Sequence, residues 1–226
     1  MKRLFLLFLF PFLLYSQSRS ILFEDDQTLP FTMTINASSY TISMKGTGRI
    51  SVNNGDGTTT NYTLTSSAQN VTHSYGSSAL RTVKIYNSLA INYWSCSDNA
   101  AYAFNWSQKN KMMLTYFTCI GSNTLSGTLS LPSGMTYFYC AGSNTLSGYT
   151  TQSFSQSMNY FYLITSNGTG FTAAQIDQLC IDLNGSAWGG SSKTLRLTGS
   201  KIGAPTSASA AARSAMALRS ISITTN

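Results

Sequence analysis

Charged residues are scarce in this chain: Asp, Glu, Lys and Arg together make up 9% of its 226 residues. Only seven residues are acidic, and there is a single histidine, His73. The 14 Lys and Arg residues give a formal net charge of +7, but they are scattered rather than clustered. This distribution argues against a nucleic-acid-binding surface. It also leaves few side chains for acid–base chemistry or metal binding.

The few candidate catalytic groups do not form a recognisable catalytic pattern. His73 falls in a predicted strand, where a structural hydrogen bond is expected. Asp177 and Asp182 lie five residues apart on a predicted helix, which places them on different faces. The acidic run at residues 24–26 is interpreted as a solvated linker rather than a Ca²⁺ site. The sequence contains no phosphate-binding loop or dinucleotide fingerprint. We therefore expect a protein that is not an enzyme and that uses no cofactor or metal.

One long apolar run is present, from Leu4 to Leu14, interrupted by Pro11 and preceded by Lys2 and Arg3. Small polar residues follow it, and this order is typical of a secretory signal peptide, here residues 1–18. The alternative is a membrane anchor, but a helix needs about 20 apolar residues to span a bilayer. No later segment is apolar enough to span. The mature chain is therefore predicted to be secreted or at the cell surface, with no membrane span.

The middle of the chain repeats itself. Residues 114–119 read Leu-Thr-Tyr-Phe-Thr-Cys, residues 135–140 read Met-Thr-Tyr-Phe-Tyr-Cys, and both are followed by Gly-Ser-Asn-Thr-Leu-Ser-Gly after one apolar residue. Related copies begin at Ile91 and Met158, so the starts are 23, 21 and 23 residues apart. Apolar residues recur at positions 1, 4 and 6 of each copy. A period of this length predicts a stack of similar coils.

This pattern resembles the leucine-rich repeat. The resemblance implies one short parallel strand in each repeat. The Asn of each repeat is expected to form a hydrogen bond with the neighbouring backbone at the turn. The chain departs from the family because Asn falls one place late in three copies and because aromatic residues or Met replace many leucines. The structural repeat positions under this interpretation are Cys96, Cys119, Cys140, Asn99, Asn123, Asn144 and Asn167.

Four cysteines are present, the fourth being Cys180. An even number in an exported chain permits disulfides. The other three, however, recur at the same position of successive repeats, where a small inward-facing residue is expected. Buried free thiols are therefore favoured over disulfides.

The C-terminal segment, residues 171–226, changes character. Residues 172–183 carry apolar residues at helical spacing with Thr172 as the N-cap, and residues 207–218 are rich in Ala. Residues 193–198 and 220–225 are predicted strands. Repeat proteins need such closing elements over the last exposed coil. The segment is similar to the C-terminal caps of leucine-rich-repeat proteins of bacteria and their phages.

The segment before the repeats, residues 19–88, is predicted to be β throughout. Residues 31–35, 40–44, 49–52 and 82–85 alternate polar and apolar side chains, and Gly55-Asp56-Gly57 marks a turn. That turn, followed by His73-Ser74-Tyr75, resembles the polycystic-kidney-disease-type β-sandwich, although Asn54 stands where that family usually has Trp. The implied role is a support that caps the first repeat.

The fold prediction is a mainly β protein with a few C-terminal helices. Its parts are a small β-sandwich-like module, a short leucine-rich-repeat-like solenoid over residues 89–170, and an α/β cap over residues 171–226.

Positions 3 and 5 of each repeat are predicted to point outward, because side chains alternate along a strand. Position 3 is a tyrosine in all four copies, and position 5 is a tyrosine in the last two. Tyrosine combines a rigid apolar ring with a hydroxyl, as interface anchors do. The candidate binding residues are Tyr93, Tyr116, Tyr137, Tyr139, Tyr160 and Tyr162.

Two functions follow from this face. In the first, a secreted or cell-surface binding or adhesion protein recognises a glycan or protein partner through the tyrosines. In the second, the tyrosines only pack the sheet, since cross-strand aromatic pairs stabilise by about 0.2–1 kcal/mol. The chain is then a structural spacer or assembly component of a surface or phage-tail-like apparatus. An export signal disfavours an ordinary phage structural protein.

Overall fold

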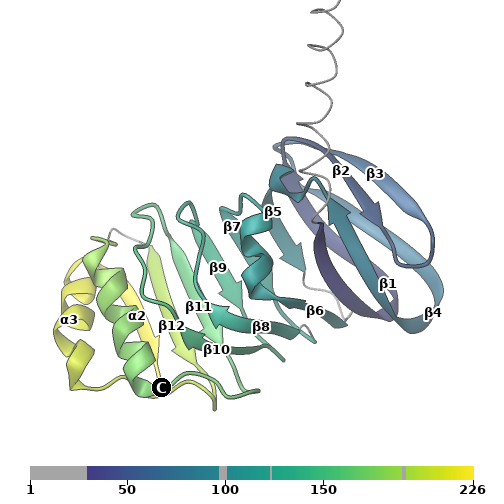
Figure 1. The fold of residues 1–226 in the computed structure, drawn as a ribbon. Helices are drawn as coiled ribbons and strands as arrows, with labels where there is room; N and C mark the ends of the chain where they lie inside the picture. Colours follow the sequence, from purple (N-terminus) through teal and green to yellow (C-terminus); the bar gives the residue numbers. More distant parts are fainter. Residues whose placement is uncertain (1–29, 97–100, 123, 190–191) are drawn as a thin grey trace, which may run out of the picture.

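The computed structural model describes residues 30–96, 101–122, 124–189 and 192–226 (Figure 1). Within these residues the chain is mainly β, its strands join in one large mixed sheet, and its α-helices come late, which confirms the coarse fold prediction. The predicted signal peptide and the acidic run at residues 24–26 lie outside the described residues.

The elements follow one another from a β module, through a coil of short strands, to two helices. The first strands are β1 (Phe31–Gly46), β2 (Gly48–Asn53), β3 (Thr59–Leu64) and β4 (Gln69–Tyr86). The coil contains η2 (Ser88–Ala90), β5 (Ile91–Cys96), β6 (Ala101–Asn105), η3 (Trp106–Lys111), β7 (Tyr116–Cys119), β8 (Thr124–Leu129), β9 (Tyr137–Cys140), β10 (Thr145–Tyr149) and β11 (Tyr160–Ile164). The last elements are α2 (Ala173–Gly185), β12 (Lys193–Thr198), η4 (Ser207–Ser209), α3 (Ala210–Leu218) and β13 (Ile221–Thr225).

The module is built on the long antiparallel pair of β1 and β4. The sequence predicts two strands over residues 31–35 and 40–44, but they form one continuous strand. A β-bulge between Ala37 and Ser39 shifts the alternation by one residue, so apolar side chains on both halves face inward. The buried residues on either side of the bulge are Phe31, Met33, Ile35, Tyr40, Ile42 and Met44.

β1 also joins the module to the coil. Its Thr34–Asn36 segment pairs with β6 and its Ser43–Gly46 segment pairs with β5, in both cases antiparallel. The Phe31 ring lies 5.2 Å from the rings of both Trp94 and Phe104, in edge-on contacts. The first strand therefore covers the start of the coil.

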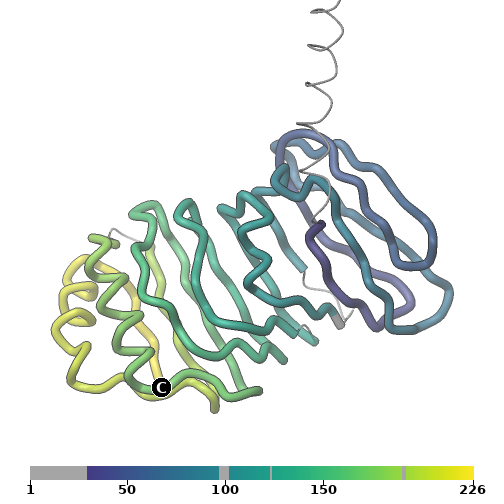
Figure 2. Tube along the Cα trace, in the orientation of Figure 1, coloured from purple at the N-terminus to yellow at the C-terminus, as the bar shows by residue number. Residues whose placement is uncertain are grey.

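The coil has two walls of parallel strands. One wall is β5, β7, β9, β11, β12 and β13 in that spatial order, and the other is β6, β8 and β10. Figure 2 shows the chain passing between them as it advances from the module toward the helices. Of the two walls, only the strands of the first were predicted from the sequence. The second wall was missed, although Thr-Leu-Ser-Gly recurs in both β8 and β10.

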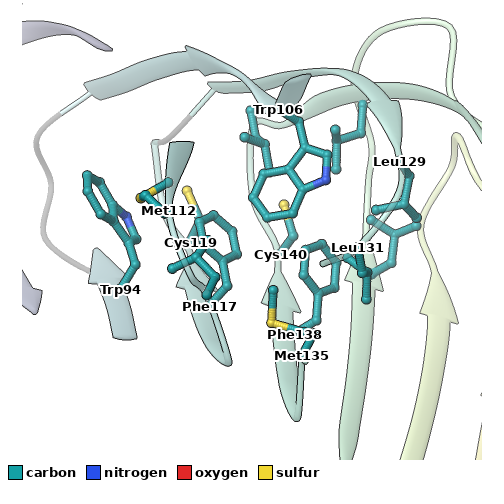
Figure 3. Packing of buried hydrophobic residues seen from close by; sticks show 14 of the residues in the cluster. Trp94, Trp106, Met112, Phe117, Cys119, Leu129, Leu131, Met135, Phe138 and Cys140 are labelled. Atoms are coloured by element: carbon teal, nitrogen blue, oxygen red, sulfur yellow. The ribbon is translucent and has the colours of Figure 1, made fainter. Parts of the chain in front are cut away.

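Aromatic side chains from the first wall and from η3, together with Leu129 of β8, pack in the space between the walls (Figure 3). The Trp106 ring lies 4.6 Å from that of Phe117 and 5.6 Å from that of Phe138. All three residues are fully buried. Burying a side chain of this size contributes about 1.5–3 kcal/mol, so this row of rings holds the coils together.

Glycines set the corners of the coil. Gly142 adopts φ +100°, a region that L side chains rarely occupy. A Cβ there would stand 2.1 Å from the carbonyl oxygen of Gly121, the equivalent residue of the preceding coil. The repeated Gly is therefore required because successive backbones approach closely at this corner.

The C-terminal elements match their predictions closely. Thr172 caps α2, its hydroxyl accepting from the Gln175 backbone N–H while the Gln175 side chain accepts from the Thr172 N–H. β12 and β13 extend the first wall in parallel. In Figure 1, α2 and α3 cover the end of the molecule far from the module. No helix in the described ranges has the length and apolar character that crossing a bilayer requires.

Candidate binding face

Four tyrosines occupy equivalent places on β5, β7, β9 and β11. The strands are parallel and in register, so Tyr93, Tyr116, Tyr137 and Tyr160 follow one another across the sheet. The next residue on β9, Phe138, points into the core and is fully buried. Because side chains alternate along a strand, the tyrosines lie on the opposite, outer surface. We call these four residues the stacked row.

The rings of the stacked row lie nearly parallel. Successive centroids are 4.2, 4.3 and 4.6 Å apart, and the interplanar angles are 15°, 11° and 2°. A ring with neighbours on both sides has no free π-face to offer. The stacked row therefore presents ring edges and hydroxyl groups outward, rather than flat aromatic surfaces.

A second row runs beside the first and consists of Ser95, Thr118, Tyr139 and Tyr162. The Tyr139 ring meets that of Tyr162 edge-on at 5.2 Å. The Tyr162 ring stacks on that of Tyr160 at 4.2 Å. The two rows thus merge on β11, and together they form what we call the tyrosine face.

Cations stand at both ends of the tyrosine face. Lys45 is opposite Tyr93 in the β1–β5 register, and its Nζ lies 4.7 Å from the Tyr93 ring centroid. Arg196 is opposite Tyr162 in the β11–β12 register, and its guanidinium carbon lies 5.4 Å from that ring centroid. Both contacts are within the range of cation–π attraction. Neither cation could be placed on this surface from the sequence, because both residues lie outside the repeats.

The pKa values of two phenols on this face are raised by burial. Burial, followed by the proximity of Tyr116, raises the pKa of Tyr137 to about 12. Burial likewise raises the pKa of Tyr160, whereas hydrogen bonds from Tyr160 and Arg196 lower that of Tyr162. Tyr137 and Tyr160 therefore keep their hydroxyl protons at neutral pH and can donate hydrogen bonds.

Two polar atoms of this face are buried without a hydrogen-bond partner among the described residues. They are Oγ1 of Thr118 and Nε of Arg196. Thr118 is only 7% exposed. Buried polar atoms are usually paired, and an unpaired one is unfavourable by about 1–3 kcal/mol. These two atoms mark the tyrosine face as a surface whose polar groups are not all satisfied within the fold.

The repeat cysteines lie in the core and not on the tyrosine face. Cys96, Cys119 and Cys140 are aligned across β5, β7 and β9. All four cysteines are free and buried, which confirms the preference for free thiols. Burial raises the pKa of Cys180, on α2, to about 12. These thiols therefore serve as small apolar residues.

The repeat asparagines do not behave alike. Asn144 is buried, and its Nδ2 donates to the Ile164 carbonyl of the next coil at 2.8 Å, the type of contact that the repeat implies. Asn167 is exposed, and its backbone carbonyl accepts from the Thr165 hydroxyl. Asn99 and Asn123 lie outside the described residues.

The polar groups considered for catalysis are engaged elsewhere. His73 Nε2 lies 2.7 Å from Asp56 Oδ2, and the other carboxylate oxygen accepts from the Thr58 backbone and hydroxyl. The Thr58 hydrogen bonds, and then that of His73, lower the pKa of Asp56. The structural hydrogen bond expected of His73 is present. Its partner was not predicted, although Asp56 lies in the recognised turn.

The two helical aspartates face different partners, as their spacing predicts. Asp177 accepts from the Thr206 backbone and hydroxyl, whereas Asp182 accepts from the Tyr149 hydroxyl at 2.7 Å. Within the described part of the chain, no three His, Cys, Asp or Glu side chains gather in a way that could hold a metal ion.

A surface pocket of about 370 Å³ lies on the module, far along the sheet from the helices. Arg49, Tyr62 and Tyr86 are among the residues that line it. Sequence reasoning missed this pocket because its lining residues come from separate strands with no repeated spacing.

Comparison with protein-family models, with curated proteins and with solved structures found no match for this chain. The functional interpretation consequently depends on the geometry of the face itself.

Proposed function

We propose that this chain is a secreted or cell-surface binding or adhesion protein that recognises a glycan or protein partner through the tyrosine face. The observation that carries the proposal is the alignment of six tyrosines into one surface with a cation at each end. Interfaces use tyrosine for this combination of rigidity and hydrogen bonding. The proposed cellular location, secreted or at the cell surface, depends on the apolar run near the N-terminus.

The proposal includes the type of fold. We interpret the coil as a short leucine-rich-repeat-like solenoid, supported by the 21–23-residue period, by the inward aromatic residue of each copy and by the inward Cys of three copies. We interpret the preceding strands as a polycystic-kidney-disease-like β-sandwich module, supported by the Gly-Asp-Gly turn and the antiparallel pairing. The module would then support the first coil, and the helices would close the last one.

Binding of residues 19–226 to a glycan array and to cell-surface proteins tests the function. The decisive variant changes Tyr93, Tyr116, Tyr137 and Tyr160 to Phe, because Phe keeps the stack and removes the hydroxyls. The control changes Tyr62 and Tyr86, in the module pocket, to Phe. A partner that is lost in the first variant and retained in the control supports the proposal. A partner that both variants retain argues against the tyrosine face.

The alternative function is a structural spacer or assembly component. One observation favours it: among the described strands, β13 ends the sheet and pairs with β12 along only one of its edges. An open strand edge can pair with another chain. Sedimentation and electron microscopy distinguish the two functions, since ordered self-association without ligand binding supports the spacer.

A further inference from the structure

The charges of the described residues are strongly unbalanced. Only Asp56, Asp177 and Asp182 are acidic, against eleven Lys and Arg residues. Asp56 lies in the β2–β3 turn, and the other two lie on α2. Each carboxylate accepts hydrogen bonds from its own surroundings within the fold. No carboxylate of the described residues therefore neutralises the cations of the tyrosine face.

Lys45 and Arg196 are held in fixed places at the two ends of this face by their contacts with Tyr93 and Tyr162. Five strand spacings separate β1 from β12 in the sheet order. At about 4.8 Å per spacing, the two cations are about 24 Å apart. A ligand that reaches both must be extended and must run across the strands.

The surface between the cations selects for hydrogen-bonding groups. The faces of the inner rings are covered by their neighbours, so neither a sugar ring nor an aromatic side chain can lie flat on them. The hydroxyls at the ring edges of the stacked row remain. Backbone groups are not available, because the sheet pairs them from strand to strand. A peptide that binds by adding a strand therefore has no edge here.

We propose that the tyrosine face binds an acidic polysaccharide that lies across the strands from Lys45 to Arg196. Such a polymer carries both hydroxyl and acidic groups along an extended chain. Its acidic groups would pair with the two cations, and its hydroxyl and ring oxygens would accept from the phenols. This inference depends on the proposed function of the face and specifies the chemistry of its ligand.

Polygalacturonate and dextran sulfate are suitable probes, because neutral counterparts exist for both: methyl-esterified polygalacturonate and dextran. Binding to residues 19–226 is measured by calorimetry at low and high salt. We expect the acidic polymers to bind and the neutral ones to bind at least about tenfold more weakly. Raising NaCl from about 50 to about 500 mM should weaken the acidic complexes, because salt screens exposed charges.

Two double variants locate the site. Lys45→Gln with Arg196→Gln should weaken binding of the acidic polymers about tenfold and reduce its salt dependence. Lys84→Gln with Lys201→Gln removes the same charge from exposed residues outside the face and should change affinity less than about twofold. Near-UV circular dichroism checks that both variants are folded.

Several outcomes overturn the inference. Equal binding to acidic and neutral polymers, lost in the Tyr→Phe variant, leaves the proposed function standing but removes the charge requirement. Equal weakening by both double variants shows non-specific attraction to a basic protein. Failure of both acidic polymers to bind overturns the inference directly, as does binding of polyglutamate that depends on Lys45 and Arg196 when neither polysaccharide binds.

Discussion

The module and the coil share one sheet but are held together in different ways. In the module, unlike residues make contacts that occur once: the Tyr40 hydroxyl donates to Asn54 Oδ1 at 2.7 Å, and Arg81 lies 3.9 Å from the Tyr75 ring centroid. In the coil, like residues meet like across neighbouring strands. Phe117 faces Phe138 at 5.8 Å inside the coil, while the tyrosines stack outside it.

This difference shows what repetition does to a protein surface. When a segment is duplicated and the copies stack in register, each favourable contact is reproduced at every interface. The inner aromatic row and the outer stacked row both arise in this way. The module has no such multiplication: it has its own buried apolar core, and each of its buried polar contacts occurs once. Substitutions should therefore have different consequences in the two regions.

The largest effect is expected from Phe138→Ala. The ring is fully buried between those of Phe117, Phe161 and Trp106, at centroid distances of 5.3–5.8 Å. Removing it should lower the free energy of unfolding by about 3–5 kcal/mol, measured by urea denaturation. The control is Tyr137→Ala on the outer side of the same strand, with an expected loss of about 1 kcal/mol or less. Comparable losses for the two variants would contradict a core located between the walls.

The second-largest loss of stability is expected from a substitution in the module. Asn54 is 1% exposed, accepts from the Tyr40 hydroxyl and donates to the Thr58 hydroxyl. Asn54→Ala leaves the buried Tyr40 hydroxyl unpaired and should lower the free energy of unfolding by about 1–3 kcal/mol. Adding Tyr40→Phe should recover part of this loss, since the unpaired group is then absent. Additive losses in the double variant would show that the two side chains are not coupled.

The sequence was sufficient to predict the coil's first wall, because the copies of an internal repeat can be aligned with one another and equivalent positions assigned. The inward Phe and Cys and the outward Tyr could be assigned from period and alternation alone. The orientation of the rings could not, since stacking depends on the spacing and rotation of neighbouring strands. A single copy of β7 gives no indication that Tyr116 lies parallel to Tyr93.

Features that occur once in the chain were harder to predict. The bulge that makes β1 one strand has no distinctive sequence signal, and the pairing of Asp56 with His73 joins residues 17 positions apart. The ends of the tyrosine face were missed for the same reason. Lys45 and Arg196 lie outside the repeats, and only the tertiary sheet order brings them beside Tyr93 and Tyr162.

A smaller effect on stability is expected at alkaline pH. The pKa of Tyr137 in the coil and that of Tyr75 in the module are both raised to about 12, in each case first by burial. A tyrosine with a raised pKa contributes stability that is complete below about pH 10, its ordinary pKa, and is lost as the pH rises through about 12. Tyr137→Phe should therefore reduce the loss of stability over this interval, measured by urea midpoints at successive pH values.

The secondary causes of these two pKa shifts differ, which allows a sharper test. The Asp56 charge also raises the pKa of Tyr75, whereas Tyr116 and its neighbours act on Tyr137. Asp56→Asn should lower the pKa of Tyr75 and leave that of Tyr137 unchanged, as followed by phenolate absorbance in single-Tyr→Phe backgrounds. A shift of both residues would show that the two regions are electrostatically coupled.

The smallest effect on stability is expected at Thr118, where the coil departs from the pattern of the module. The module's buried Asn54 is hydrogen-bonded, but the Thr118 hydroxyl is buried without a partner among the described residues. Thr118→Val removes that hydroxyl and keeps the β-branched shape, so stability should be unchanged or higher by up to about 1 kcal/mol. Thr165→Val is the matched control, because the Thr165 hydroxyl is fully buried and donates to the Asn144 carbonyl at 3.1 Å. This control should lower the free energy of unfolding by about 1 kcal/mol.

The Thr118 variant also separates packing from recognition. If the hydroxyl is retained in order to bind a ligand, Thr118→Val should weaken binding to the tyrosine face while leaving the unfolding midpoint in place. Thr165→Val should lower the unfolding midpoint and leave binding unchanged, because the Thr165 hydroxyl bonds to a neighbouring coil and does not lie on the outer surface. If Thr118→Val lowers stability as much as Thr165→Val, the hydroxyl has a partner within the fold. The unsatisfied group would then no longer support a binding role for this face.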